Sequence, residues 1–233
     1  MRESLESRRA RTRALIRHLD RAYPDAACAL HFSTPLELLV ATILAAQCTD
    51  ERVNQVTASL FQKYRRAADY AAAAPAIFEG EIRSTGFFRA KTRSVLGMAR
   101  TLVEQHGGEV PRTLEALTAL PGVGRKTANV VLGNAFGVPG IAVDTHVFRV
   151  TQRLGLAKAD DPDDVEAQLA EAVPRPQWTH FCHLIQAHGR QVCHARTPAC
   201  PSCPVRALCP WPGKMGGRGT TPAASAARGR RRR

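Results

Sequence analysis

A short turn with the sequence PGVG constrains the fold of this chain more than any other feature. Its proline and its two glycines, Gly122 and Gly124, separate the apolar segments 114–120 and 130–135. The backbone therefore has to reverse tightly between two short helices, with Val123 inside the turn. The pattern predicts a helix-hairpin-helix element.

Such a turn suits an anion. Glycines let a ligand approach the peptide N–H groups closely, and the free N–H donors at the start of the next helix favour negative charge. We therefore expect Gly122, Val123, Gly124 and Arg125 to contact a nucleic-acid phosphate. A nucleotide P-loop is rejected because it requires GxxxxGK[ST] after a strand. For an isolated GxG, an ordinary turn between helices is the other interpretation.

Lys126 follows the turn directly, in a chain that rarely uses lysine. Of 33 basic residues, only five are lysines. Unlike a guanidinium, a lysine amine can lose its proton and attack a carbon. The positive end of the helix and the neighbouring Arg125 both favour a fraction of free amine near neutral pH. Lys126 is therefore a candidate Schiff-base nucleophile.

Asp144 lies shortly downstream and has two compatible interpretations. It is a candidate N-cap of a helix whose buried face is formed by Val147, Val150, Thr151 and Leu154. A capping carboxylate is rigid, so it could also stabilise positive charge that develops on a sugar carbon. The two interpretations can hold at once.

Four cysteines with the spacing Cx6Cx2Cx5C occupy a proline-interrupted segment: Cys193, Cys200, Cys203 and Cys209. Such a loop can wrap thiolates around one centre. No signal peptide precedes it, so a reducing compartment is expected and disulfides are disfavoured. The spacing alone leaves zinc and iron–sulfur equally open. We expect Cys28, Cys48 and Cys182 to be small core residues.

Apolar residues recur at helical spacing along the whole body. A capping box with proline begins one helix at Thr34, and the same periodicity recurs in 53–64, 95–102 and 178–185. Sustained period-two alternation is missing, and no apolar run is long enough for a membrane span. The sequence therefore predicts an all-α protein without a membrane segment.

The formal net charge of +13 on 233 residues favours a nucleic-acid partner, a property that basic RNA-binding and ribosomal proteins share. Arginines are concentrated in residues 2–21 and 228–233, which we interpret as flexible additions to the body. The composition from residue 212 onward predicts a disordered basic tail.

The segment 120–149 closely resembles that of the endonuclease III family of the helix-hairpin-helix superfamily, and the resemblance extends from about Phe32 to Cys209. It implies a helix-hairpin-helix DNA glycosylase fold with a six-helix barrel lobe and an iron–sulfur cluster lobe. The implied divisions are a basic segment and a helix that joins the cluster lobe at 1–28, the barrel with the helix-hairpin-helix at 29–138, the rest of the cluster lobe at 139–211 and the tail at 212–233.

The resemblance also assigns roles to residues. It implies that Lys126 is the attacking amine and Asp144 the catalytic carboxylate. The cysteine spacing resembles that of a [4Fe-4S] loop. The resemblance implies three further DNA contacts: Gln47, which fills the space left by a flipped nucleotide, the wedge residue Phe87, and Arg196 in the cysteine loop. It also implies that Asp50 lies near the base pocket. Ala45 and Cys48 depart from the family pattern there.

The implied activity is that of a base-excision repair DNA N-glycosylase for oxidised or damaged pyrimidines, with an AP lyase step through a lysine Schiff base. The expected partner is double-stranded DNA that contains such lesions or abasic sites. We expect a monomer in a bacterial cytoplasm, associated with the nucleoid. A mismatch-specific glycosylase of the same superfamily and a noncatalytic DNA-binding iron–sulfur module remain alternatives.

Overall fold

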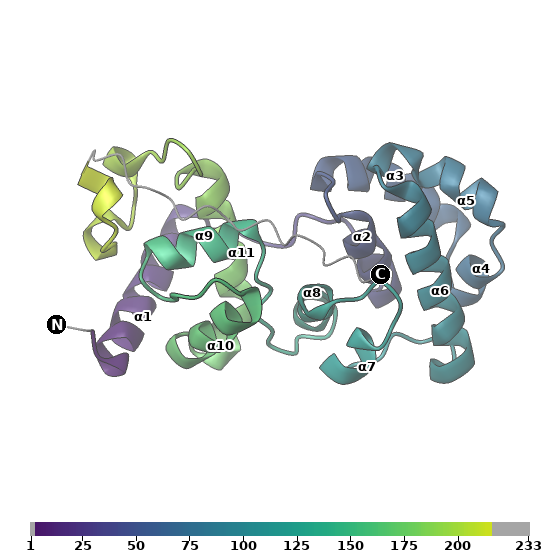
Figure 1. Ribbon diagram of the computed structural model, residues 1–233, viewed down its shortest axis with the longest axis horizontal. Helices are drawn as coiled ribbons and strands as arrows, with labels where there is room; N and C mark the ends of the chain where they lie inside the picture. Colours follow the sequence, from purple (N-terminus) through teal and green to yellow (C-terminus); the bar gives the residue numbers. More distant parts are fainter. Residues whose placement is uncertain (1–2, 216–233) are drawn as a thin grey trace, which may run out of the picture.

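The protein is described by a computed structural model that covers residues 3–215, and within this range it contains helices and no strand (Figure 1). The helices are α1 Leu5–Ala22, α2 Pro35–Leu44, α3 Asp50–Lys63, α4 Ala67–Ala71, α5 Pro75–Ile82, α6 Phe88–His106, α7 Leu114–Thr118, α8 Arg125–Ala135, α9 Thr145–Arg153, α10 Pro162–Ala172 and α11 Trp178–Gln191. Short 3-10 helices are η1 Arg83–Thr85, η2 Arg175–Gln177, η3 Cys200–Ser202, η4 Arg206–Leu208 and η5 Pro212–Met215. The all-α prediction is confirmed for the described residues.

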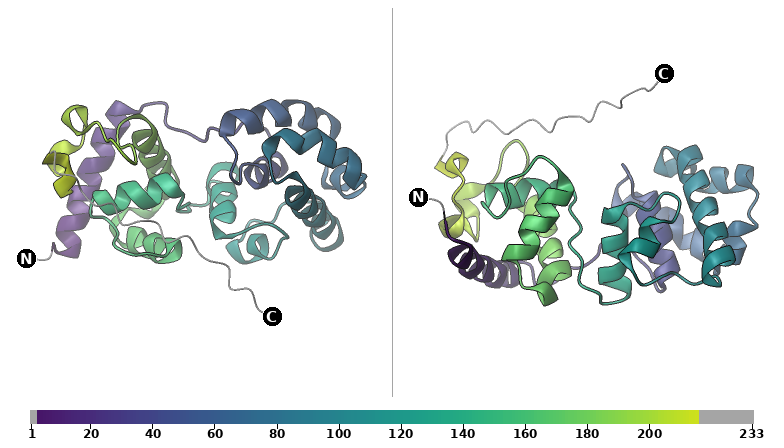
Figure 2. Two further views of the ribbon diagram at one scale, coloured as in Figure 1. Left: turned by 45° about the horizontal axis from the view of Figure 1, so that its top comes forward. Right: turned by 60° about the horizontal axis from the view of Figure 1, so that its bottom comes forward.

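The helices form two lobes, each around its own apolar core. The core of the first lobe is built from buried residues between Leu30 and Leu132, on α2 to α8. The core of the second lobe combines buried residues of α1 with residues between Ile141 and Val205. Figures 1 and 2 show the lobes side by side, with α8 on the side of the first lobe that faces the second.

Local sequence signals explain where the helices begin. Thr34 accepts a hydrogen bond from the backbone N–H of Glu37, whose carboxylate accepts one from the N–H of Thr34, so the expected capping box is present. Pro35 occupies the first turn of α2, where its missing N–H costs nothing. On α6, the predicted apolar stripe is fully buried at Val95, Met98, Ala99 and Leu102. Helical periodicity was therefore a sound guide to the body of the chain.

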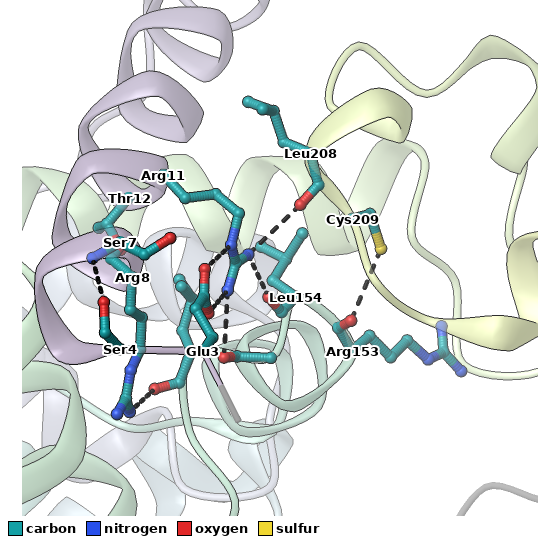
Figure 3. Close-up of polar contacts among 12 residues, drawn as sticks. Glu3, Ser4, Ser7, Arg8, Arg11, Thr12, Arg153, Leu154, Leu208 and Cys209 are labelled. Carbon is teal, nitrogen blue, oxygen red and sulfur yellow. Dashed lines mark hydrogen bonds and ion pairs between the residues drawn. The ribbon is translucent and has the colours of Figure 1, made fainter. Parts of the chain in front are cut away.

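The prediction that the arginine-dense N-terminus is a flexible addition is wrong for α1. Leu15, Ile16 and Leu19 are buried in the second core, because they share one face of the helix. The arginines on the other faces take part in packing the lobe. Arg11 pairs with Glu3 and donates hydrogen bonds to the backbone oxygens of Leu154, Gly155 and Leu208 (Figure 3).

The predicted tail begins inside the described range. Residues 212–215 form the 3-10 helix η5. The remainder of the tail, 216–233, and the first two residues lie outside the described residues.

Candidate active site and nucleic-acid interface

The hairpin turn between α7 and α8 uses each glycine for a different reason. Gly122 has φ = 75°, and a Cβ at this position would lie 2.4 Å from the Cβ of Ser94. Gly124 occupies the N-cap position of α8 but has no side chain that could accept a hydrogen bond from the first N–H groups of the helix. The first N–H groups of α8 therefore lack the side-chain acceptor that most helices use, which suits an external anion. Val123 anchors the turn, because its side chain is buried in the first core.

Lys126 lies in the first turn of α8 and is exposed. No hydrogen bond or ion pair to it occurs within residues 3–215, so its amine is accessible. Arg125, in contrast, donates two 2.8 Å hydrogen bonds to the carboxylate of Glu166 on α10. These hydrogen bonds raise the pKa of Arg125. Glu166 therefore offsets the charge of Arg125, and the positive end of α8 adds to the potential around Lys126.

Asp144 is the N-cap of α9, as its position in the sequence predicts. Its Oδ1 accepts a 2.7 Å hydrogen bond from the backbone N–H of Val147. The segment before it is fixed to α8, because the buried side chain of Asn129 donates a 2.9 Å hydrogen bond to the carbonyl of Ile141. Asn129 follows Lys126 by one helical turn, so this bond ties the chain that leads to Asp144 to the helix that carries the amine.

The predicted buried face of α9 is confirmed. Val147, Val150 and Thr151 are completely buried and Leu154 is 2% exposed. Cys182 on α11 is a core residue, as expected. Burial raises the pKa of Cys182 to about 12, and the nearby charge of Asp144 contributes in the same direction. Asp144 therefore begins a helix whose inner face belongs to the core of the second lobe.

Gln47 and Phe87 each lie in a turn of the first lobe. Gln47 is exposed after α2 and has φ = 53°. Phe87 precedes α6, has φ = 47° and is 67% exposed. The adjacent Phe88 instead packs against the first core. Since left-handed backbone is strained for bulky residues, it points to a role for the two exposed side chains.

Asp50 is the first residue of α3, and its carboxylate accepts a 2.7 Å hydrogen bond from Arg190 of α11. This ion pair joins the two lobes. Both residues line a cavity of about 560 Å³, together with Ala29, His31, Glu51, Asn54 and Gln55. Sequence reasoning missed Arg190 because its partner is 140 positions away and no local pattern marks it. The departures from the family pattern are close by: Ala45 and Cys48 are half-buried against the first core.

Comparison with known proteins shows which family the chain belongs to. The model of the HhH-GPD superfamily of base excision DNA repair proteins matches residues 40–175. Endonuclease III of Synechocystis sp. is 50% identical over 88% of this chain and 94% of the relative. Endonuclease III of Escherichia coli K12 is 43% identical over 82% and 91%, respectively. The chain belongs to the endonuclease III family.

Solved structures agree with this membership. A non-covalent complex of endonuclease III with DNA matches with a TM-score of 0.85 and 45% identity, over 91% of this chain and 99% of that one. A trapped covalent endonuclease III–DNA intermediate matches with a TM-score of 0.82 and 46% identity, over 87% and 95%. As a member of the endonuclease III family, the chain is an enzyme of base excision repair, a DNA glycosylase. None of the described helices is long and apolar enough to cross a membrane.

The cysteines expected to bind a cluster in this family lie together in the loop after α11. Cys193, Cys200 and Cys203 are partly buried and form no disulfide, and the Cys209 Sγ lies 3.6 Å from the carbonyl oxygen of Arg153. Burial raises the pKa of Cys203, and the charges of the other three cysteines act in the same direction. In residues 3–215 no three His, Cys, Asp or Glu side chains are gathered as a metal site.

Two arginines of α9 hold this cysteine loop, and sequence reasoning missed both. Arg153 is 6% exposed, donates to the carbonyls of His194 and Ala195 and lies 3.4 Å from the Cys193 Sγ. Its Nε is buried and meets no acceptor among residues 3–215. Arg149 donates to the carbonyls of Gly189 and Cys193. The buried guanidinium group of Arg153 beside the Cys193 thiol, with the half-buried Arg149 next to it, fits an anionic, thiolate-bound group.

Arg196 lies in the same loop and is exposed. Neighbouring positions carry no further positive charge, because residues 197–199 are Thr, Pro and Ala. The side chain of Arg196 is therefore accessible on the surface of this loop, where it could contact a DNA phosphate.

Proposed function

We propose that this glycosylase removes oxidised or damaged pyrimidines from double-stranded DNA and then cleaves the strand at the abasic site as a lyase. The observation that carries the proposal is Lys126: an exposed amine without an ion pair in the described chain, at the start of a helix that follows a glycine turn. The likeness to endonuclease III structures with DNA, including a trapped covalent intermediate, supports it.

In the proposed reaction, the Lys126 Nζ attacks the anomeric carbon of the flipped nucleotide. The bond from that carbon to the base breaks, and the base leaves with the electron pair and takes up a proton. The sugar ring then opens to an imine between Nζ and the carbon. Loss of a proton from the adjacent sugar carbon expels the 3′ phosphate, which nicks the strand. The Asp144 carboxylate stabilises the positive charge that develops at the sugar.

Other residues would bind and open the duplex. The N–H groups around Gly122, Val123 and Gly124 bind a phosphate, and Gln47 and Phe87 enter the space left by the flipped nucleotide. We assign Asp50 to the pocket that receives the base, since it lines the cavity between the lobes. Arg196 is assigned to the phosphate backbone, and so is Arg125 once its guanidinium leaves Glu166. The enzyme is assigned as a monomer of the bacterial cytoplasm.

The four cysteines Cys193, Cys200, Cys203 and Cys209 would hold a [4Fe-4S] cluster. When bound, the cluster supplies a rigid centre for the loop that carries Arg196. Purified protein should contain iron and acid-labile sulfide in equal amounts, and Cys203→Ala should lose both. Zinc in place of iron would overturn the assignment.

Reductive trapping tests the nucleophile. Protein incubated with a duplex that carries thymine glycol or an abasic site should form a covalent adduct when borohydride is added. Lys126→Ala should form none, whereas the matched control Lys158→Ala, also at an exposed lysine, should trap normally. An adduct formed by Lys126→Ala would overturn the assignment.

A panel of defined lesions tests the substrate class. We expect base release and strand cleavage from thymine glycol and from abasic duplexes. Activity confined to mismatched duplexes would favour a mismatch glycosylase. Binding without turnover of any duplex would instead favour a noncatalytic module.

A further inference from the structure

Lys91 is the buried exception among the lysines whose burial the structure describes, since Lys63, Lys126 and Lys158 are exposed. It lies on the apolar face of α6, one turn before Val95, and is only 4% exposed. A lysine is rarely placed in a core unless its ammonium group is bound. The chain also uses arginine at most basic positions, so a lysine here indicates that a compact ammonium group is needed.

The ammonium group joins two segments that are remote in sequence. Its Nζ donates 2.8 Å hydrogen bonds to the carbonyl of Leu44 and to the carbonyl of Thr85. Leu44 is the last residue of α2, and Thr85 is the last residue of η1. Because terminal carbonyls lack a donor from their own helix, a cation is favourable at both ends.

Each capped helix end leads directly into one of the two strained turns. Gln47 follows Leu44 by three residues, and Phe87 follows Thr85 by two. Among the described residues that are not glycine, Gln47 and Phe87 alone have positive φ. Both side chains are exposed. The buried ammonium group of Lys91 is therefore hydrogen-bonded to the helix end that precedes each of the two turns.

We propose that Lys91 is a positioning residue that fixes the Gln47 turn and the Phe87 turn relative to each other, so that both side chains enter the duplex together. This inference rests on the proposed function, in which these two residues open the duplex. Lysine suits the task because its three rotatable donors reach carbonyls that approach from different directions, whereas the planar fork of arginine suits carboxylates and phosphates.

The test compares paired with unpaired substrate. Lys91→Met keeps an unbranched apolar stem, one atom shorter, and removes the donors, and Lys158→Met makes the same change at an exposed lysine. Rates are measured with the cluster-loaded full chain on a thymine glycol duplex and on the same oligonucleotide as a single strand. The ratio of the two rates does not depend on the fraction of folded enzyme, since both come from one preparation.

We expect Lys91→Met to lower the duplex to single-strand ratio about tenfold, whereas Lys158→Met leaves the ratio unchanged. Lys91→Gln, which keeps two donors on a shorter stem, should be intermediate. Phe87→Ala and Gln47→Ala should also lower the ratio. Lys91→Met added to the double variant Gln47→Ala, Phe87→Ala should have little further effect, because the groups that it positions are gone.

Two failures can be told apart. If Gln47→Ala and Phe87→Ala lower the ratio but Lys91→Met does not, the positioning role is wrong and the proposed function stands. If none of the three variants changes the ratio, the duplex-opening roles of Gln47 and Phe87 are wrong, and the role of Lys91 is overturned with them. Rates that fall equally on both substrates for Lys91→Met show a merely structural lysine and also overturn the inference.

Discussion

The hairpin turn at Gly122 and the turns at Gln47 and Phe87 all enter the left-handed region of backbone conformation, but with different residues. The hairpin uses glycine, with φ = 75°. The other two turns use large side chains, with φ = 53° and 47°. Glycine adopts this conformation readily, whereas other residues pay roughly 1–2 kcal/mol.

The difference follows from what each turn presents. At the hairpin the backbone is the binding group, and Ser94 leaves no room for a Cβ at Gly122. At the other two turns the side chain itself is presented to solvent, so the strain is retained and the surrounding structure has to hold it. The two carbonyl contacts of Lys91 are part of that support.

The largest expected effect separates binding from chemistry at the hairpin. Lys126→Arg keeps the positive charge in the first turn of α8 but removes the nucleophile. Duplex binding, measured by fluorescence anisotropy, should stay within a few-fold of the parent. Strand cleavage should fall on the order of a thousandfold or more. Retained cleavage would show that the hairpin only binds and that the amine comes from elsewhere.

The next effect concerns the stability of the glycine turn. Gly122→Ala places a Cβ at positive φ and against Ser94, so the free energy of unfolding should fall by roughly 1–3 kcal/mol in urea titrations. Gly124→Ala is the matched control, because Gly124 has φ = −91° and no atom within 4 Å of the added Cβ. Its cost should stay below about 1 kcal/mol. Equal costs would contradict the distinction between the two glycines.

Phe87→Gly makes the reverse change, because it removes a large side chain from a turn with positive φ. Glycine relieves the left-handed strain, which stabilises the protein, but it also increases the entropy of the unfolded chain, which destabilises it. The net effect should raise the free energy of unfolding by about 0.5 kcal/mol. Cleavage of a paired lesion should fall about tenfold, whereas a single-stranded abasic site should be cleaved normally. Phe87→Leu, which keeps an apolar side chain in the same turn, should stay near the parent in activity. A Phe87→Gly protein with full duplex activity would contradict the wedge role.

The smallest effect concerns the ion pair beside the hairpin. Glu166→Gln weakens the hold on Arg125, whose side chain is 46% exposed, so stability should change by less than about 1 kcal/mol. The freed guanidinium should add about one phosphate contact and steepen the dependence of log affinity on log salt by about one unit. Glu171→Gln has the same charge change away from Arg125. An identical salt dependence for both variants would show that Arg125 does not contact the phosphates.

The regular helices and their caps were predictable because their signals are local. The capping box at Thr34, the buried stripe of α6 and the N-cap role of Asp144 each depend on residues within a few turns. Arginine content alone suggested that α1 is a flexible addition and obscured its buried apolar face, although the family resemblance implies that this helix joins the cluster lobe. The catalytic and DNA-binding roles themselves remain predictions to be tested by the variants above.

The contacts that organise the site were not predictable, because they join distant parts of the chain. Asp50 meets Arg190 across the lobes, and Arg125 meets Glu166. Both pairs join carboxylates and guanidinium groups that look like ordinary surface charges in the sequence. Arg153 likewise gives no local sign that it supports the cysteine loop.

By itself, the sequence determined the helices, the glycine turn with the lysine after it, the cysteine spacing and the family, because each is written in neighbouring residues. Tertiary structure alone decided which charges are paired and which amine stays accessible. It also decided that a lysine on the apolar face of α6 joins the turns of Gln47 and Phe87. The physical reason is that hydrogen bonds and ion pairs depend on distance in space, and packing brings together groups that the chain order keeps apart.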